Sequence, residues 1–229
     1  MPTVVIGNNT GDDYSGFHDN RLDSGLVDYN HGAHTCGYIG AQSSGRTMRE
    51  IQRWLLDDIT AGATCDGATL YLYDTDWGNR NADCAISIYR IADANGSWVE
   101  GTSLGDSQSG SSCWNYRAYN TNTWAGSAGL STAGTDYVNT VIGSATFTDG
   151  TSGYRTITLN SSGLTVLADW FGDASNNGVM LIGSGSNDYW TEIISSNGTD
   201  GSRPYLSVTY TASGGATVND QYFRRQRAS

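Results

Sequence analysis

Hydrophobic and polar residues alternate with a period of two in two segments of the chain. In residues 69–73 two leucines alternate with two tyrosines, and in residues 85–91 isoleucines alternate with serine and tyrosine. Successive side chains of a strand point to opposite faces, so this pattern is typical of strands with one face toward a core. β-branched and aromatic residues between turn residues predict further strands at residues 4–6, 51–56, 146–148, 154–159, 179–182, 190–194 and 205–211.

One segment departs from the β pattern. Within residues 162–171, Leu164, Leu167 and Phe171 recur at spacings of three and four, which predicts a short helix with one apolar face. Asn and Ser at residues 160–162 can cap its start, and Gly172 can end it. We expect this helix to pack on the edge of a β-sandwich, with Trp170 in the core.

Composition supports a turn-rich all-β protein. The chain has 229 residues, of which 30 are glycine and two are proline, and glycine with short polar residues serves tight turns. We divide it into an N-terminal leader (1–11), one domain (12–212), and a linker with a C-terminal tail (213–229). The long loop predicted at residues 101–145 is expected to be functional or to serve as a cover.

Charge limits the partners. The formal net charge is −11, and all 12 basic residues are arginine, so the chain is poorly suited to binding a phosphate backbone and we expect no nucleic acid partner. No apolar run of 18 residues occurs, so no membrane helix is expected. The N-terminal residues lack the pattern of a secretory signal. Either a signal was removed or none was used, and Met1 favours the second alternative, which is expected for virion proteins released by lysis.

A series of fragments appears in a fixed order along the chain: DNRL (19–22), QRWLLDDI (52–59), ATLYLY (68–73), WVEGT (98–102), CWNYR (113–117) and RPYLSVTY (203–210). Over residues 12–211 this series resembles DNRLRE-domain proteins, which include disaggregatase-related repeats and an alginate-associated family of carbohydrate-binding modules. Trp54 stands where phenylalanine is common in the family, and Cys113 stands where threonine is common.

The resemblance implies a jelly-roll-like antiparallel β-sandwich with one short helix and no catalytic role. It implies that Trp98, Trp114 and Trp170 are structural. Relatives of this kind occur on cell-surface, secreted and phage structural proteins, and some bind acidic polysaccharide. No glycan-contact motif of the family maps onto this sequence.

The residues themselves give little indication of catalysis. The three histidines, His18, His31 and His34, fall in one early region. The Gly-x-Ser-x-Gly motif of a nucleophilic serine is absent, and no base stands at a recognisable spacing from a serine. We therefore expect that the protein is not an enzyme.

Metal binding and disulfide formation are left open. His31, His34 and Cys36 could ligate a transition metal in a turn, but no second cluster completes the site, which favours solvated loop residues. Structural calcium is a better candidate than a transition metal, because acidic residues, Asp23 and Asp28 among them, crowd two loops, although ordinary acidic loops explain them slightly better. The candidate calcium ligands are Asp12, Asp13, Asp19, Asp74 and Asp76. The cysteines, which form either two disulfides or four thiols, are Cys36, Cys65, Cys84 and Cys113.

Aromatic residues in or beside predicted loops are candidates for sugar binding. Sugar rings stack their apolar faces on exposed aromatic rings, and an arginine can meet a uronate carboxylate. Packing of the same rings in the core is the alternative. The candidates are Trp77, Arg80, Tyr116, Arg117, Tyr119, Trp124, Tyr189 and Trp190.

The C-terminal tail combines arginines with aromatic residues, unlike the acidic body. A frayed terminus is the simplest interpretation, and a docking peptide is the functional one. The docking residues would be Tyr222, Phe223, Arg224, Arg225 and Arg227.

Together these observations predict a non-catalytic, surface-displayed structural module. We expect a phage virion protein (capsid decoration, fibre or tail component) with a role in glycan binding or adhesion. A secreted polysaccharide-binding module accompanying a carbohydrate-active enzyme is the alternative, and a polysaccharide lyase is the third. The expected partners are a virion shell or neighbouring subunit bound through the tail, a polysaccharide, and further copies of the chain in a homo-oligomer. The expected location is the virion surface or, alternatively, the extracellular space or cell surface.

Overall fold

The computed structural model describes residues 1–7, 16–77, 83–172, 175–184 and 189–213. These ranges contain one helix, α1 (Ser161–Trp170), and one 3-10 turn, η1 (Asp93–Asn95). The strands are β1 (Thr3–Ile6), β2 (Phe17–Asp23), β3 (Cys36–Ala41), β4 (Thr47–Trp54), β5 (Thr64–Asp74), β6 (Cys84–Ile91), β7 (Tyr116–Ala118), β8 (Asn122–Thr123), β9 (Tyr137–Phe147), β10 (Gly153–Thr158), β11 (Val179–Ser184), β12 (Tyr189–Ile194) and β13 (Tyr205–Thr211).

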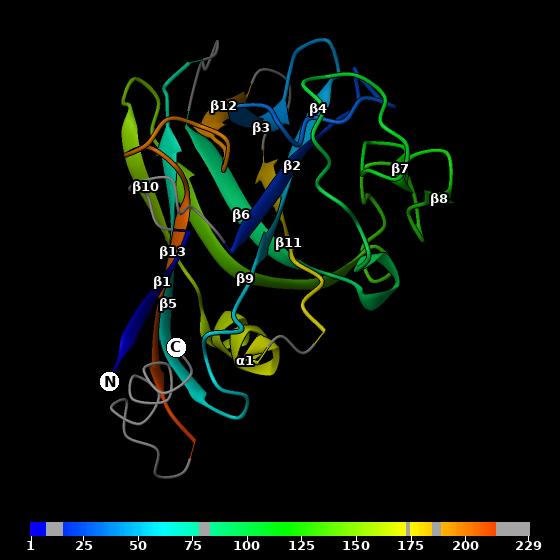
Figure 1. Cartoon of the computed structure of the whole chain (residues 1–229). Coiled ribbons are helices and arrows are strands. Elements are labelled where there is room, and N and C mark those ends of the chain that lie inside the picture. The colour runs from blue at the N-terminus through cyan, green and yellow to red at the C-terminus, as the bar shows by residue number, and fades with distance from the viewer. Residues whose placement is uncertain (8–15, 78–82, 173–174, 185–188, 214–229) are drawn as a thin grey trace.

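The strands form an antiparallel β-sandwich (Figure 1). Eleven strands share one continuous hydrogen-bonded path, β1-β13-β5-β12-β3-β4-β11-β6-β9, with β10 paired to β5 and β2 paired to β4. The path turns from one layer to the other at the β3–β4 hairpin, where Gly40 pairs with Met48 and Ala41 with Thr47. The prediction of an all-β sandwich with a single helix is confirmed.

The main core lies between the two layers. It joins Ile39, Leu70 and Val208 of the first layer with Ile88 and Leu181 of the second, all of which are fully buried. The predicted alternation in β5 and β6 is confirmed, because Leu70, Leu72, Ile86 and Ile88 face this core while the side chains between them are only partly buried.

Helix α1 closes one end of the main core. Asn160 caps its start by accepting a hydrogen bond from the Gly163 amide at 3.1 Å. Leu167 and Trp170 pack into the core, and Trp170 is 1% exposed. The predicted helix and its core tryptophan are therefore confirmed.

A second, smaller core lies on the outer face of the β4–β11–β6 layer. Residues 92–136 cross this face and pack Trp98, Trp124 and Leu130 against Ile51 and Met180 of the sheet. We call residues 92–136 the cover segment. The prediction of a loop over residues 101–145 is wrong at its end, since β9 begins at residue 137, and within the loop, since β7 and β8 form a small hairpin.

Strand β2 buries charged side chains instead of apolar ones. Asp19, Arg21 and Asp23 are each 4% exposed or less. Two of them pair with buried polar residues of β4, Asp19 with Gln52 and Arg21 with Glu50. Because the sequence of β2 lacks apolar alternation, it predicts an acidic loop. This prediction is wrong, since the segment forms a strand. The sequence does not predict strand β3 either, because two of its six residues are glycine and glycine is uncommon in strands.

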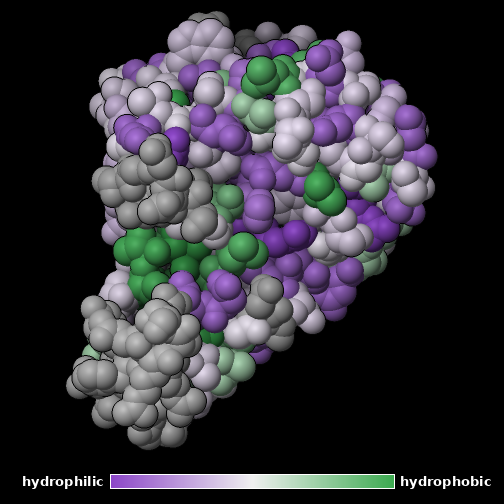
Figure 2. All heavy atoms as spheres, viewed as in Figure 1, coloured by the Kyte–Doolittle hydropathy of each residue, from purple (hydrophilic) through white to green (hydrophobic). Residues whose placement is uncertain are grey.

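The remaining surface on the face seen in Figure 2 is mostly hydrophilic. Hydrophobic residues gather on the side where Figure 1 places β1 and β13, and Val5 of β1 is half exposed. All four cysteines lie in the described ranges and are free thiols. No helix of the described residues combines the length and apolar character needed to cross a membrane.

Asp136 organises the end of the cover segment, and its removal tests how far the cover contributes to stability. This fully buried carboxylate accepts hydrogen bonds from the amides of Gly126 (2.7 Å), Ser127 (2.9 Å) and Thr132 (2.8 Å). Since Asp136→Ala leaves these donors without their acceptor, we expect the free energy of unfolding to fall by about 3 kcal/mol.

Urea denaturation measures this change. The control is Asp57→Ala, which removes an exposed carboxylate and is expected to change stability by less than about 0.5 kcal/mol. Equal stability of the two variants would show that the cover segment is held without Asp136.

Candidate functional site

Three aromatic rings from separate elements meet at one end of the β3–β12 pair. Trp77, just after β5, stacks on Tyr38 of β3 with ring centroids 6.2 Å apart. The ring of Trp190 on β12 lies edge-on to both, at 5.8 Å from Trp77 and 5.3 Å from Tyr38. Trp77 is 59% exposed, whereas Trp190 is buried. We call Tyr38, Trp77 and Trp190 the aromatic platform.

The turn that carries Trp77 is held by hydrogen bonds. The Trp77 amide donates to Thr75 Oγ1 at 3.1 Å, and this hydroxyl donates to Glu192 Oε1 at 2.8 Å. The Asp76 amide donates to Asp74 Oδ1 at 3.0 Å. These contacts fix the turn to β12, so the exposed ring of Trp77 is supported on its inner side and open on its outer side.

A second aromatic group lies on the cover segment. A pocket of about 380 Å³ is lined by Tyr116 and Trp124 with residues 126–128, and Tyr119 lies edge-on to Tyr116 at 5.4 Å. Trp124 is only 3% exposed, and its Nε1 donates to the carbonyl of Cys113 at 3.0 Å. Trp124 is therefore a core residue, and it cannot offer an open ring face as predicted.

The predicted sugar-binding residues separate into two groups. Trp77, Tyr189 and Trp190 lie at β12, where Trp77 is the residue with a largely exposed ring. Tyr116, Arg117, Tyr119 and Trp124 lie at the β7–β8 hairpin, which Figure 1 places on the far side of the molecule from β12. Arg80 lies outside the described residues, as do the docking residues Tyr222, Phe223, Arg224, Arg225 and Arg227.

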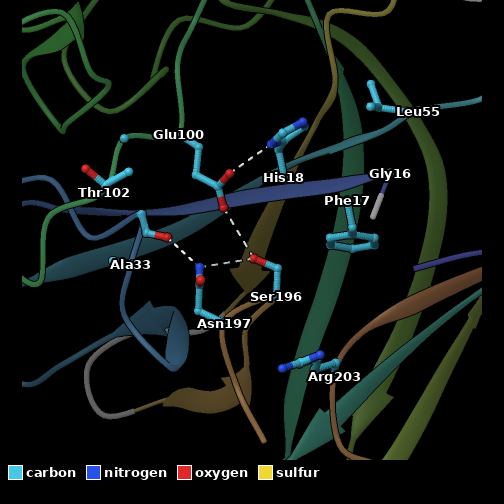
Figure 3. A pocket seen from close by; sticks show the side chains of 12 residues that line it. Gly16, Phe17, His18, Ala33, Leu55, Glu100, Thr102, Ser196, Asn197 and Arg203 are labelled. Atoms are coloured by element: carbon cyan, nitrogen blue, oxygen red, sulfur yellow. Dashed lines mark hydrogen bonds and ion pairs between the residues drawn. The ribbon is translucent and has the colours of Figure 1, made fainter. Parts of the chain in front are cut away.

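A larger pocket, which the sequence did not indicate, opens beside the start of β2 (Figure 3). Its volume is about 660 Å³, and its walls come from β2, residues 32–33, residues 100–102, residues 196–197 and Arg203. We call it the β2 pocket. It brings together parts of the chain that are far apart in sequence.

A hydrogen-bonded network lines one wall of the β2 pocket. His18 Nδ1 lies 2.8 Å from Glu100 Oε2, and the Asp19 amide donates to Glu100 Oε1 at 3.1 Å. Ser196 donates twice to the Asp19 carboxyl, through its amide at 2.7 Å and its hydroxyl at 2.8 Å. The network ties β2, the cover segment and the loop after β12 together.

The environment of this network shifts its pKa values. Burial, and then the nearby Glu100 carboxylate, raise the pKa of Asp19 to about 7. The hydrogen bond to Glu100 raises the pKa of His18, because the carboxylate stabilises the imidazolium. Burial also raises the pKa of Glu50, behind Asp19 on β4, well above its ordinary value.

This arrangement differs from a serine hydrolase triad. In a triad the histidine stands between serine and carboxylate, whereas here Glu100 stands between His18 and Ser196, and the serine hydroxyl donates to Asp19. What the wall offers is a set of oriented hydrogen-bonding groups. No sequence pattern indicates this wall, because His18 and Glu100 are 82 positions apart.

The candidate metal ligands do not assemble. Asp12 and Asp13 lie outside the described residues, Asp19 is committed to Ser196, and Asp74 accepts from Thr191 Oγ1 at 2.9 Å. Asp23 pairs with Arg46, and Asp28 accepts from Asn115 at 2.9 Å. Within the described ranges, no three His, Cys, Asp or Glu residues form a group suited to a metal ion. Asp76 therefore joins no such group, and neither do His31, His34 and Cys36.

No family model matches this chain, and no curated protein matches it either. The resemblance to DNRLRE-domain proteins therefore stays a prediction.

The Asp19 pKa predicts a pH dependence of stability. The unfolded carboxyl titrates near 3.8 and the folded one near 7, so the folded state holds this proton more tightly. The stabilisation that the Asp19 carboxyl contributes to the free energy of unfolding is fully present below about pH 4 and is lost as the pH rises through 7. The loss is at most about 4 kcal/mol. The Asn side chain of Asp19→Asn does not titrate, so the stability of wild type should fall relative to this variant between pH 4 and 7.

Urea denaturation of both proteins from pH 4 to 8.5 gives this difference. Groups that do not interact with Asp19 titrate alike in both proteins and cancel, including His31, whose pKa burial lowers to about 3. The Asp19 charge also raises the pKa values of His18 and Glu50, so the measured difference includes these two couplings. A constant offset between the two proteins across the whole range would show that Asp19 is already ionised near pH 4.

Proposed function

We propose that this protein is a non-catalytic structural module displayed on a virion surface, as a capsid decoration, fibre or tail component, and that it binds polysaccharide through the aromatic platform. The module would belong to the DNRLRE-like sandwiches that the sequence resembles. The observation that carries the glycan proposal is the exposed, braced ring of Trp77.

An exposed tryptophan face suits sugar binding for a physical reason. The ring of Trp77 is 59% exposed, although indole is among the largest apolar groups a protein can bury. Tyr38 and Trp190 hold it from behind at 6.2 and 5.8 Å, so little conformational entropy is lost when a ligand covers it. The apolar face of a pyranose ring can cover such a surface while its hydroxyls stay in water.

The sandwich and the tail support display on a particle. A sandwich with two cores gives a rigid body that presents its loops outward. The tail, residues 214–229, lies outside the described residues, and its role rests on composition alone. Three of its residues are arginine within a chain of net charge −11, which suits docking on an acidic neighbour.

A secreted polysaccharide-binding module is the alternative, and the same platform supports it equally. A polysaccharide lyase is favoured by a different observation, the His18–Glu100 pair in a pocket of about 660 Å³. Incubating the purified protein with alginate and following the absorbance of unsaturated ends separates a lyase from a binder.

Replacing Trp77 tests the glycan proposal. Because Trp77→Ala removes the stacking surface without touching either core, we expect its affinity for a bound polysaccharide to fall at least about tenfold, with little change in stability. Affinity electrophoresis against alginate, pectin, dextran and mannan identifies the polymer, and calorimetry measures the loss.

The matched control is Tyr29→Ala, which removes another exposed aromatic ring from a loop outside the platform. Its affinity should equal that of wild type. A Trp77→Ala protein that binds as tightly as wild type would rule out the platform as the binding surface.

Deleting residues 214–229 tests the display proposal. A virion component that docks through its arginines and aromatics should lose incorporation into particles, while its polysaccharide affinity stays unchanged. Particle composition after complementation with the truncated protein is the measurement. Normal incorporation would favour the secreted alternative.

A further inference from the structure

We propose that the β2 pocket is a second carbohydrate site, one that takes a short neutral oligosaccharide. The inference extends the proposed glycan function and rests on it, but it concerns a different surface. The pocket volume of about 660 Å³ falls within the range of roughly 300–1,000 Å³ that is usual for sites of small ligands. The shape of the pocket, its charge balance and its hydrogen-bonding groups carry the argument.

Charge balance in the β2 pocket favours a neutral ligand. Both basic side chains that line it already pair with carboxylates, His18 with Glu100 at 2.8 Å and Arg203 with Asp200 at 2.8 Å. The Asp19 carboxyl lies directly behind the wall and accepts hydrogen bonds from Ser196. An anionic sugar would approach these carboxylates without an uncompensated cation, and a cationic ligand would have to displace His18 or Arg203.

Hydrogen-bonding groups in the pocket suit hydroxyls, which both donate and accept. Glu100 Oε2 accepts from His18 and keeps a second lone pair. Asn197 uses its Nδ2 to donate to the carbonyl of Gly32 at 2.7 Å, which leaves Oδ1 as an acceptor. Thr102 Oγ1 accepts from Gln108 at 3.0 Å and keeps its own proton for donation.

The pocket also has an apolar side. Phe17, which is 5% exposed, and the half-buried Leu55 line it next to His18. In Figure 3 these two residues lie on the opposite side of His18 from Glu100. Apolar contact on one side and oriented polar groups on the other match the two faces of a sugar ring.

The walls of the pocket are fixed before any ligand enters. The buried side chain of Asn30 accepts hydrogen bonds from the amides of Gly32 and Ser103, each at 3.2 Å, and so joins two of the wall segments. A Cβ on Gly32 would lie 2.2 Å from the carbonyl oxygen of Glu100, so only glycine permits this approach. A preformed wall binds with a small entropic cost.

The β2 pocket and the aromatic platform lie toward opposite ends of β3 and β12. Trp190 pairs with Gly40 at the platform end, and Ile194 pairs with Cys36 at the end that leads to Ser196. The four residue steps from Trp190 to Ile194 span about 13 Å of strand. Variants at one site are therefore expected to leave the other intact.

The test uses four trisaccharides, namely cellotriose, maltotriose, mannotriose and trigalacturonate. The first three are neutral, and the last is the anionic comparison. Calorimetry of the full chain measures their affinities for wild type and for Glu100→Gln, Thr102→Val, Trp77→Ala and the control Asp57→Asn. Glu100→Gln removes the charge that orients His18, and Thr102→Val removes one donor from an exposed residue.

We expect wild type to bind at least one neutral trisaccharide more tightly than trigalacturonate. Glu100→Gln should weaken that binding about tenfold or more and Thr102→Val about three- to tenfold, while Trp77→Ala and Asp57→Asn leave it unchanged. Because Thr102 is exposed, its replacement does not threaten the fold, and thermal denaturation checks Glu100→Gln.

Three results would overturn the inference. The first is that wild type binds no neutral trisaccharide, and the second is that both pocket variants bind it as tightly as wild type does. The third is that wild type prefers trigalacturonate and the pocket variants abolish this preference. Loss of polysaccharide binding in Trp77→Ala alone would leave the proposed function standing without the second site. Loss of trisaccharide binding in the pocket variants alone, with no effect of Trp77→Ala on polysaccharide binding, would support the pocket site and count against the aromatic platform.

Discussion

Both candidate sites depend on charged side chains buried between the two layers. Arg21 of β2 is 4% exposed, and its guanidinium lies 4.3 Å from the ring of Tyr38, 3.0 Å from His31 Nδ1 and 3.7 Å from Asp23. Buried charge is costly unless it is paired, so these contacts hold β2 and β3 in one arrangement. Tyr38 belongs to the aromatic platform, and the same strand β2 carries His18 and Asp19 to the pocket.

The buried carboxyl of Glu50 also accounts for a glycine on β3. A Cβ on Gly37 would lie 2.2 Å from Glu50 Oε2, so a side chain at this position would force the buried Glu50 carboxyl to shift. Burial raises the pKa of Glu50 well above its ordinary value, since a neutral carboxyl is cheaper to bury than a charged one. The layers therefore meet over a polar contact whose geometry is specific, whereas an apolar contact would tolerate sliding.

The sequence predicted the parts of the fold whose physics is local. Alternation marks β5 and β6 because both strands place apolar residues on the main core, and Asn160 with the following apolar spacing marks α1. Strand β2 gives no such signal, because its inward residues are charged and find their partners only in the folded chain. For the same reason a loop position could not tell that Trp124 is buried and Trp77 exposed.

The sites were harder to predict than the fold because their residues meet only through tertiary structure. Trp77 was identified from its loop, but Tyr38, which supports it, lies in a strand that the sequence did not reveal. His18 and Glu100 meet only because the cover segment returns across the sheet, held by Asn20, which donates to the Ser112 carbonyl at 2.9 Å, and by Asn30. The spacing of these residues along the sequence does not predict that they meet.

If the platform and the β2 pocket both bind sugar as proposed, holding them on one body would have a consequence for adhesion. Each site alone offers a small contact area, so its affinity for a polysaccharide is expected to be weak. With both sites on one framework, and with many copies on one particle as proposed, binding at the first site would raise the effective concentration at the next. The fixed orientation of the platform and the pocket on β3 and β12 makes this gain available without further ordering of the chain. Under the proposed display in many copies, weak sites would therefore be enough to hold a particle on a glycan surface.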